Sequence, residues 1–182
     1  ELMGSDKIII AVDLLDLQFA KTGQKTILEE YYKQFLINQD PEIKFVFFSP
    51  NLPQFSRKTK LGIICNHLVY HWWKQIVLPI KTFFKGADIL FCNDYFAPLF
   101  TPGFKNVQVF HDAFFFEYPQ HYNQLWLKLF KKIALPAANK SAFIITTSQY
   151  AKQKINTFTG IPLDKIIPIY PGPKSLQNKA KV

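Results

Sequence analysis

With 182 residues, the chain is long enough for one domain with a sizeable core but too short for two full α/β domains. Its residues are 48% hydrophobic and 19% charged, and no apolar run approaches the roughly 18 residues that a membrane-spanning helix needs. The formal charge of +9 comes almost wholly from lysine, with Arg57 as the one arginine. Because specific recognition of nucleic-acid bases usually relies on the planar guanidinium group of arginine, we expect no nucleic-acid partner.

Short apolar or β-branched runs alternate along the chain with segments of helical periodicity. The expected strands are 7–12, 43–48, 61–65, 87–92, 106–110, 142–147 and 166–170. The expected helices are 27–36, 72–84, 125–134 and 149–158. Pro136 should kink or end the third helix, Ser148 is a suitable N-cap for the fourth, and Gly160 should stop it. Because parallel neighbouring strands need crossover connections, this alternation predicts an α/β Rossmann-like domain over 7–170, a parallel sheet with helices on both faces.

The two ends of the chain differ from this pattern. We expect residues 1–6 to be extraneous to the natural chain or disordered, and 171–182, which begins Pro-Gly-Pro and continues lysine-rich, to be a linker or truncated tail. The start lacks the charged-then-apolar pattern of a secretory signal, so we expect a cytoplasmic protein, whose lysines leave attachment to the inner face of an anionic membrane open. The bias toward lysine, isoleucine, asparagine and phenylalanine points to an AT-rich bacterial source.

The strand expected at 106–110 delivers His111 and Asp112 together at its carboxyl end. In open parallel sheets, ligands bind beyond the carboxyl ends of the strands, so this ionisable pair is a candidate catalytic site. The alternative is that the histidine caps the strand and hydrogen-bonds a neighbouring loop.

Thr22 and Gly23 precede the first expected helix, where backbone N–H groups and the helix dipole can receive a phosphate or a hydroxyl-rich ligand, or where the pair serves only as a cap. No Gly-x-Gly-x-x-Gly follows the first strand, and neither a P-loop nor a Gly-x-Ser-x-Gly elbow occurs. NAD, FAD, P-loop chemistry and a serine hydrolase are therefore disfavoured, and we expect no cofactor. Cys65 and Cys92 lack zinc or disulfide-framework spacing, and we expect no metal.

Three further patterns leave alternatives open. His67 and His71 have the spacing of two metal ligands on one helix face but lack an acidic third ligand nearby in sequence. The run 114–116 with Tyr118 could line an acceptor pocket, touch a membrane or pack beneath the site loop. A lipid-facing edge or simple core packing could explain an aromatic and basic set. That set consists of Tyr70, Trp72, Trp73, Lys74, Lys81 and Lys85.

In their order and spacing, several of these segments resemble the N-terminal domain of family 4 glycosyltransferases, retaining enzymes of the two-domain GT-B architecture. The segments are Asp13, Thr22-Gly23, Asp40-Pro41-Glu42, Trp73 to Pro79, Ala87 to Leu90 with Asn93, Tyr95 and Pro98, Val109 to Asp112 with Pro119, Ile144 to Ser148, and Ile166 to Gly172. The family often continues Thr-Gly with Ile-Gly-Arg-Tyr, whereas this chain has Gln-Lys-Thr-Ile, so Lys25 would have to supply charge differently.

The resemblance implies a hexosyltransferase-like enzyme that moves a sugar from a nucleotide-sugar donor to a carbohydrate or lipid-linked acceptor, with this domain holding the acceptor. It implies that His111 contacts the donor sugar near the reacting carbon and that Asp112 holds the loop or the imidazole. The implied substrate-binding residues are Thr22, Gly23, Gln24, Lys25, Asn93, Asp94, Tyr95 and Ser148. The acidic donor-binding motif of the second domain is absent, so we expect the chain alone to be inactive.

Two other interpretations remain open at this point. The chain could be a non-catalytic Rossmann-like module that binds a sugar or a nucleotide. It could also be a peripheral membrane interaction domain in which the positive charge, rather than the His-Asp pair, is the functional element.

Overall fold

The computed structural model describes residues 7–20, 23–112 and 114–172. The expected start at 1–6, the tail from 173 onward and the expected substrate-binding residue Thr22 lie outside the described residues.

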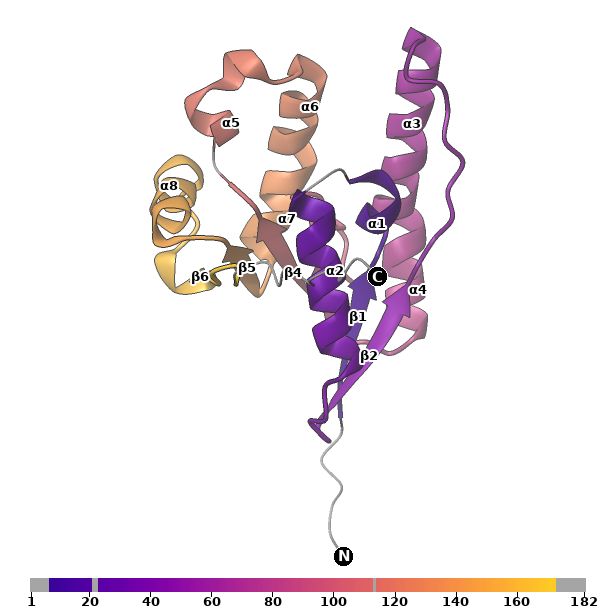
Figure 1. The fold of residues 1–182 in the computed structure, drawn as a ribbon, viewed down its shortest axis with the longest axis vertical. Helices are drawn as coiled ribbons and strands as arrows, with labels where there is room; N and C mark the ends of the chain where they lie inside the picture. Colours follow the sequence, from indigo (N-terminus) through magenta and orange to yellow (C-terminus); the bar gives the residue numbers. More distant parts are fainter. Residues whose placement is uncertain (1–6, 21–22, 113, 173–182) are drawn as a thin grey trace, which may run out of the picture.

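A single parallel sheet of six strands, in the order β2-β1-β3-β4-β5-β6, forms the centre of the fold (Figure 1). The strands are β1 (Ile8–Asp13), β2 (Ile43–Phe48), β3 (Ile89–Cys92), β4 (Lys105–Phe110), β5 (Phe143–Thr146) and β6 (Ile166–Pro168). The inner strands β1, β3 and β5 are mostly apolar along their length, because each is covered on both faces. The predicted Rossmann-like sheet is confirmed.

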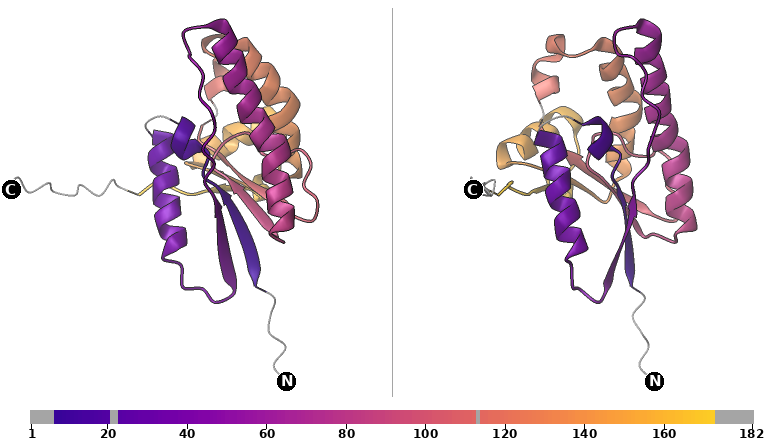
Figure 2. Two further views of the ribbon diagram at one scale, coloured as in Figure 1. Left: turned by 90° about the vertical axis from the view of Figure 1, so that its right-hand side faces the viewer. Right: turned by 45° about the vertical axis from the view of Figure 1, so that its right-hand side comes forward.

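Helices cover both faces of the sheet (Figure 2). They are α1 (Asp16–Phe19), α2 (Gly23–Leu36), α3 (Lys60–Trp72), α4 (Leu78–Phe84), α5 (Phe114–Glu117), α6 (Gln124–Leu129), α7 (Leu135–Lys140) and α8 (Gln149–Thr159). Helix α2 packs through Leu28 against Val12 and Phe91 on one face. On the opposite face, α3 and α4 pack over β1 and β3, while α6, α7 and α8 share a core with β4 and β5.

The strand order reverses between β1 and β3. The chain leaves β1 toward β2 on one side, and after β2 it returns to the other side of β1 to form β3. The helices that follow β1 and β2 consequently lie on opposite faces, and their loops separate at the carboxyl ends of β1 and β3. In open parallel sheets this switch point forms a crevice that binds ligands.

The predicted strand at 61–65 is wrong, because these residues belong to α3. A short apolar run has the composition of either a buried strand or a helix face, so its periodicity does not separate the two. The decisive feature is the helix start: the Thr59 side chain caps α3 by accepting a hydrogen bond from the Gly62 backbone N–H at 3.1 Å. The helix predicted from residue 72 therefore begins twelve residues earlier, at Lys60.

Two turns of π-helix lie directly before the Leu-Pro pairs in the long helical segments. They cover Trp73–Val77 and Phe130–Ala134. The backbone N–H groups of Leu78 and Leu135 bond carbonyls five residues back, so the helix widens just before Pro79 and Pro136, where a proline would otherwise clash with the preceding turn. Of the two effects predicted for Pro136, a kink or an end, the end is wrong, because α7 continues the helix to Lys140 and the local distortion is the π-turn.

The connection from β3 to β4 contains no helix, and buried polar side chains of β4 hold it in place. Asn106 donates to the Pro98 carbonyl at 2.9 Å, and Gln108 donates to the Tyr95 carbonyl at 2.6 Å. The Gln108 carbonyl oxygen accepts from the Ser141 hydroxyl at 2.6 Å, so the amide is satisfied on both sides. These bonds fix the start of the connection at the carboxyl edge of the sheet.

Helix α8 has the predicted ends. The Ser148 hydroxyl accepts from the backbone N–H of Ala151 at 3.1 Å, and Gly160 follows the helix with φ of +72°, a conformation that favours glycine.

Across residues 7–20, 23–112 and 114–172, no helix combines the length and the apolar character needed to cross a membrane.

Candidate functional site

Two adjoining cavities open beyond the carboxyl ends of the strands. The first, of about 490 Å³, lies between α1, α3 and the connection after β3, and the second, of about 420 Å³, lies between α2 and the residues that follow β4 and β5. Gln24 and Trp126 line both cavities. A ligand in one cavity would therefore lie next to a ligand in the other.

His111 lines the second cavity, and two loops hold it there. Its Nε2 atom lies 2.8 Å from the Asn93 backbone carbonyl oxygen, so this nitrogen carries the proton and donates. The Thr147 hydroxyl donates to the His111 carbonyl at 2.9 Å. The Nδ1 atom is buried and has no hydrogen-bond partner among the residues that the structure describes. The ring orientation is thus fixed by its hydrogen bond to the loop after β3.

Asp112 holds the loop rather than the imidazole. Its Oδ1 atom accepts from the Tyr95 hydroxyl at 3.2 Å and from the Phe114 N–H at 3.3 Å, while its own N–H donates to the Tyr95 oxygen at 3.1 Å. Burial and the neighbouring Asp112 charge raise the pKa of Tyr95 well above its ordinary value, so Tyr95 stays a neutral phenol. Of the two roles expected for Asp112, the geometry favours support of the loop.

The N-terminus of α2 forms the opposite wall of the second cavity. Gln24 and Asn93 exchange side-chain to backbone hydrogen bonds of 3.3 and 3.2 Å, which tie α2 to the end of β3. A Cβ atom placed on Gly23 would meet no atom within 4 Å, so open space lies beside this backbone. The α2 dipole adds partial positive charge at the same point.

The structure gathers most of the described site residues predicted from sequence, but not all. Gly23, Gln24, Tyr95, His111 and Asp112 line the second cavity, and Asp94 lines the first. Three others line neither cavity: Lys25, Asn93, which is fully buried and acts through its backbone carbonyl, and Ser148, which caps α8. What each of these residues contacts in a substrate remains a prediction.

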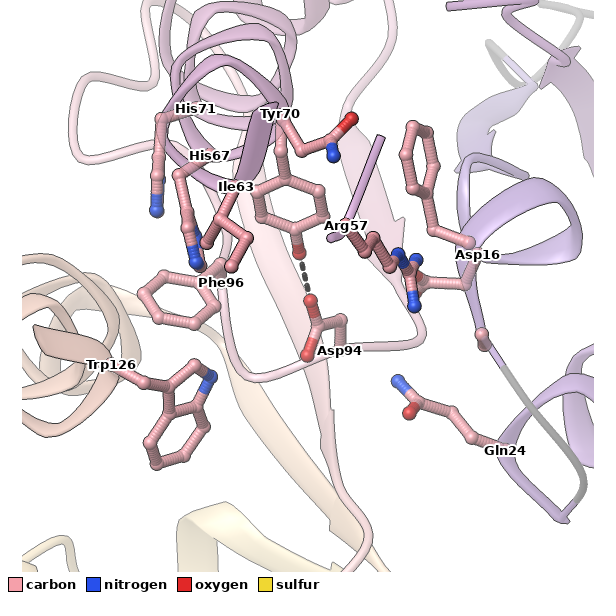
Figure 3. Close-up of a pocket in the computed structure, with 13 residues that line it drawn as sticks. Asp16, Gln24, Arg57, Ile63, His67, Tyr70, His71, Asp94, Phe96 and Trp126 are labelled. Atoms are coloured by element: carbon pink, nitrogen blue, oxygen red, sulfur yellow. Dashed lines mark hydrogen bonds between the residues drawn. The ribbon is translucent and has the colours of Figure 1, made fainter. Parts of the chain in front are cut away.

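The first cavity is lined by polar and aromatic side chains that were not predicted from the sequence as substrate-binding residues (Figure 3). They include Asp16, Arg57, Asn66, His67, Tyr70, His71 and Trp126. Phe96 and Trp126 form an aromatic wall, with rings 6.0 Å apart, and Asp16, Arg57 and Gln24 lie across from them. Such a combination of flat apolar surface and polar groups is suited to a sugar ring and its hydroxyls.

Tyr70 and Asp94 form the floor of the first cavity. The Tyr70 hydroxyl donates to Asp94 Oδ2, and Asp94 Oδ1 accepts from the Tyr95 N–H at 2.6 Å. Burial and the Asp94 charge raise the pKa of Tyr70 well above its ordinary value. Burial, assisted by His67, lowers the pKa of His71, which is therefore neutral at pH 7. Across the described ranges, no group of three metal-ligating side chains accompanies these histidines.

A buried ion pair lies beside the first cavity, where Lys74 Nζ is 5.6 Å from the centre of the Tyr70 ring. Lys74 Nζ lies 2.7 Å from Asp13 Oδ2, and both side chains are fully buried. The other Asp13 oxygen accepts from the Trp73 indole and the Leu15 N–H, each at 3.1 Å. Burial opposes the positive charge of Lys74, but the carboxylates of Asp13 and Asp16 outweigh it and raise the pKa of Lys74 well above its ordinary value.

Asp16 differs from Asp13 because no ion pair is recorded for it among the residues that the structure describes. Burial raises the pKa of Asp16 from 3.8 to about 8, with Lys74 opposing the shift and Asp94 and Asp13 adding to it. At pH 7 the Asp16 carboxyl group is therefore mostly protonated. The cavity is therefore lined by a carboxylic acid that can donate a hydrogen bond.

The aromatic and basic set considered as a lipid-facing edge divides in two. Trp73 and Lys74 are buried, and Tyr70 lines the first cavity, so these three do not face lipid. Trp72, Lys81 and Lys85 are exposed.

The run that begins at residue 114 divides in a similar way. Phe115 is buried beside the second cavity and Phe116 stacks on Phe158, whereas Phe114 and Tyr118 are half exposed. Of the alternatives considered for this run, packing beneath the site loop therefore applies to Phe115 and Phe116.

One comparison with known proteins identifies the chain's relatives. The family described as Glycosyltransferase Family 4 matches residues 19–173, which is most of the chain. No curated protein matches it significantly. The matched span includes every described residue that lines either cavity except Asp16.

Proposed function

Because the chain belongs to glycosyltransferase family 4, we propose that it is the acceptor-side, N-terminal domain of a retaining enzyme that moves a sugar from a nucleotide-sugar donor to an acceptor. The observation that carries the proposal is the pair of adjoining cavities, which share Gln24 and Trp126 at the carboxyl edge of the sheet. A group transfer needs two substrates held side by side, and this arrangement provides for both.

In this proposal the second cavity receives the sugar of the donor. His111 lies against that sugar near the reacting carbon, held in orientation by the Asn93 carbonyl and the Thr147 hydroxyl. The N-terminus of α2 at Gly23 faces the departing diphosphate, where backbone N–H groups and the helix dipole stabilise negative charge. Asp112 and Tyr95 keep the loop rigid.

Transfer that retains the anomeric configuration through an oxocarbenium-like transition state needs fixed dipoles rather than a serine or cysteine nucleophile. The His111 ring and the α2 terminus are held in place before the substrate arrives, so they need no reorganisation as charge develops. We infer that a second domain, which carries acidic donor-binding residues, closes over this cavity, and that the present chain alone does not turn over.

The first cavity would hold the acceptor. Trp126 and Phe96 offer a flat apolar surface for the face of a sugar ring, and Asp94, Gln24 and protonated Asp16 can bind its hydroxyls. Arg57 gives this side of the cavity a cation suited to an acceptor that bears a phosphate or a carboxylate.

Intrinsic fluorescence offers a test of substrate binding, because Trp126 lines both cavities while Trp72 is exposed elsewhere and Trp73 is buried. We expect titration with a panel of methyl glycosides, and separately with UDP-glucose and GDP-mannose, to change the emission of the chain for at least one member of the panel. Trp126→Phe should abolish the response and Trp72→Phe should preserve it. A response that survives Trp126→Phe, or the absence of any response, contradicts the proposed site.

A further inference from the structure

A row of exposed apolar side chains follows α3, the π-turn and α4. From Ile64 to Phe84 every fourth residue is large and apolar, and each is at least half exposed. The row consists of Ile64 (50% exposed), Leu68 (64%), Trp72 (51%), Ile76 (51%), Ile80 (50%) and Phe84 (80%). Leu61 (72%) extends the row at its start, and Phe83 (53%) adjoins Phe84 at its end. We call these eight side chains the apolar ridge.

The ridge belongs to well-packed helices rather than to a loosely held segment. The inner side of the same helices buries Gly62, Trp73, Leu78 and Thr82 against the sheet and the preceding loop. Figure 2 shows α3 and α4 forming one long column at the margin of the fold, on the side of the sheet away from α2. Single exposed apolar residues are common on protein surfaces, but a continuous row of this length indicates an interaction surface.

The segment that carries the ridge contains charges of one sign only. Residues 43–87 contain no aspartate or glutamate. Arg57, Lys58 and Lys60 are exposed at the beginning of α3, and Lys81 and Lys85 are exposed at the end of α4. An apolar centre therefore lies between two cationic ends.

We propose that the apolar ridge docks on the surface of an anionic lipid bilayer, with α3 and α4 lying in the plane of the interface. The apolar side chains would enter the boundary between headgroups and acyl chains, and the lysines at both ends would contact anionic headgroups. Trp72, in the middle of the row, has the amphipathic ring that favours this depth. A second copy of the chain fits less well, because parallel or antiparallel pairing would bring cationic ends together.

The same helix connects this surface to the first cavity. Ile63, His67 and Tyr70 project from α3 into the cavity, while Ile64 and Leu68 belong to the ridge. If the first cavity binds the acceptor, as proposed above, docking would place it one helix away from the lipid surface, within reach of the headgroup of a lipid-linked acceptor. Docking itself does not depend on that assignment, and the test below measures it separately.

Vesicle co-sedimentation of the chain tests the proposal directly. We expect partitioning onto phosphatidylcholine vesicles that contain one part in three phosphatidylglycerol to exceed partitioning onto phosphatidylcholine alone by at least about tenfold in 0.1 M NaCl, and to fall strongly in 0.5 M NaCl. The emission of Trp72 should shift to shorter wavelength on binding, and the shift should be missing in Trp72→Phe.

Paired variants distinguish the ridge from general stickiness. Leu68→Ser/Ile76→Ser should lower the partition coefficient at least about tenfold, because two buried apolar contacts are lost. Leu36→Ser/Ile37→Ser removes side chains of similar exposure, 56% and 66%, at the end of α2 and should leave it unchanged. All four side chains are exposed, so the melting temperature, measured by circular dichroism, should stay within a few degrees for each variant.

The charge is tested in the same way. Lys58→Glu/Lys60→Glu should reduce binding to anionic vesicles severalfold, while Lys25→Glu/Lys33→Glu, on α2 at the opposite face of the sheet, should change it less. Equal binding to neutral and anionic vesicles, no binding to either, or wild-type binding by the Leu68/Ile76 variant overturns the proposal. A concentration-dependent dimer that the Leu68/Ile76 variant abolishes would make the ridge a protein interface instead.

Discussion

The buried pair of Lys74 and Asp13 should be among the most sensitive points of the fold. Both side chains are fully buried and the charged atoms lie 2.7 Å apart. Lys74→Met keeps the length of the side chain but leaves Asp13 Oδ2 without its cation, while Oδ1 retains the Trp73 and Leu15 donors. Breaking one partner of a buried pair costs about 3–5 kcal/mol, because a charge stays behind in a medium that solvates it poorly.

For a chain of this size, each kcal/mol lowers the melting temperature by about 2–4 °C, so Lys74→Met should melt roughly 6–20 °C lower than the wild type. Urea titration followed by circular dichroism at pH 7 gives the free energy of unfolding directly. Asp13→Asn/Lys74→Met removes both charges and keeps an acceptor for Trp73, so it should be more stable than Lys74→Met alone. A loss below about 1 kcal/mol, or a double variant no more stable than the single one, would refute the argument that an uncompensated charge is responsible.

Two other predictions concern individual positions of the fold. Alanine at a helical glycine normally stabilises by about 1 kcal/mol, but at Gly62 a Cβ atom would overlap the Ser56 backbone carbonyl, so Gly62→Ala should instead destabilise by at least about 2 kcal/mol in urea titrations. Gly23→Ala, with open space around it, should leave stability within about 0.5 kcal/mol, and equal effects of the two variants would show that the clash is relieved at no cost. Because the folded state holds the Asp16 proton up to about pH 8 whereas the unfolded state releases it near 3.8, this residue's contribution to stability falls as pH rises through that interval. Asp16→Asn should remove that part of the pH dependence of unfolding, and an unchanged slope between pH 4 and pH 8 would mean that Asp16 is not buried in its neutral form.

Local sequence patterns were enough to predict the sheet, the ends of α8 and the position of His111. Strands covered on both faces need apolar runs, and a residue directly after such a run must lie at the carboxyl edge. His111 therefore lies at the ligand-binding edge of the sheet, whichever strands flank β4. Gly23 and Gln24 at the start of α2 follow from the same reasoning, since the long helix that connects β1 to β2 begins at this edge.

The first cavity could not be predicted in the same way, because its wall depends on α3. A strand at 61–65 would separate Ile63 from His67 and Tyr70, whereas in a helix their spacing of four and three residues places all three on one face. The capping Thr59 was the local signal that could have corrected this. The Asp13–Lys74 pair joins residues far apart in the chain, and its burial depends on the packing of β1 against the π-turn.

The buried amide side chains of β4 also could not be explained from the sequence alone. Asn106 and Gln108 break the apolar pattern of a central strand, and sequence alone gives no reason for them. Their partners are carbonyls of the connection after β3, which exist only once the strands are paired. Their positions become understandable only when the course of that connection is known.

The most direct test of the proposed function measures sugar transfer at His111. With the protein that the gene encodes in full, release of nucleoside diphosphate from a panel of nucleotide sugars gives kcat/KM for the wild type and for two variants. His111→Ala should lower it about 10²- to 10³-fold with little change in melting temperature, because it removes a preorganised group beside the reacting carbon. His121→Ala, exposed and outside both cavities, should lower it less than about twofold. Wild-type transfer by the folded His111→Ala protein would contradict the account.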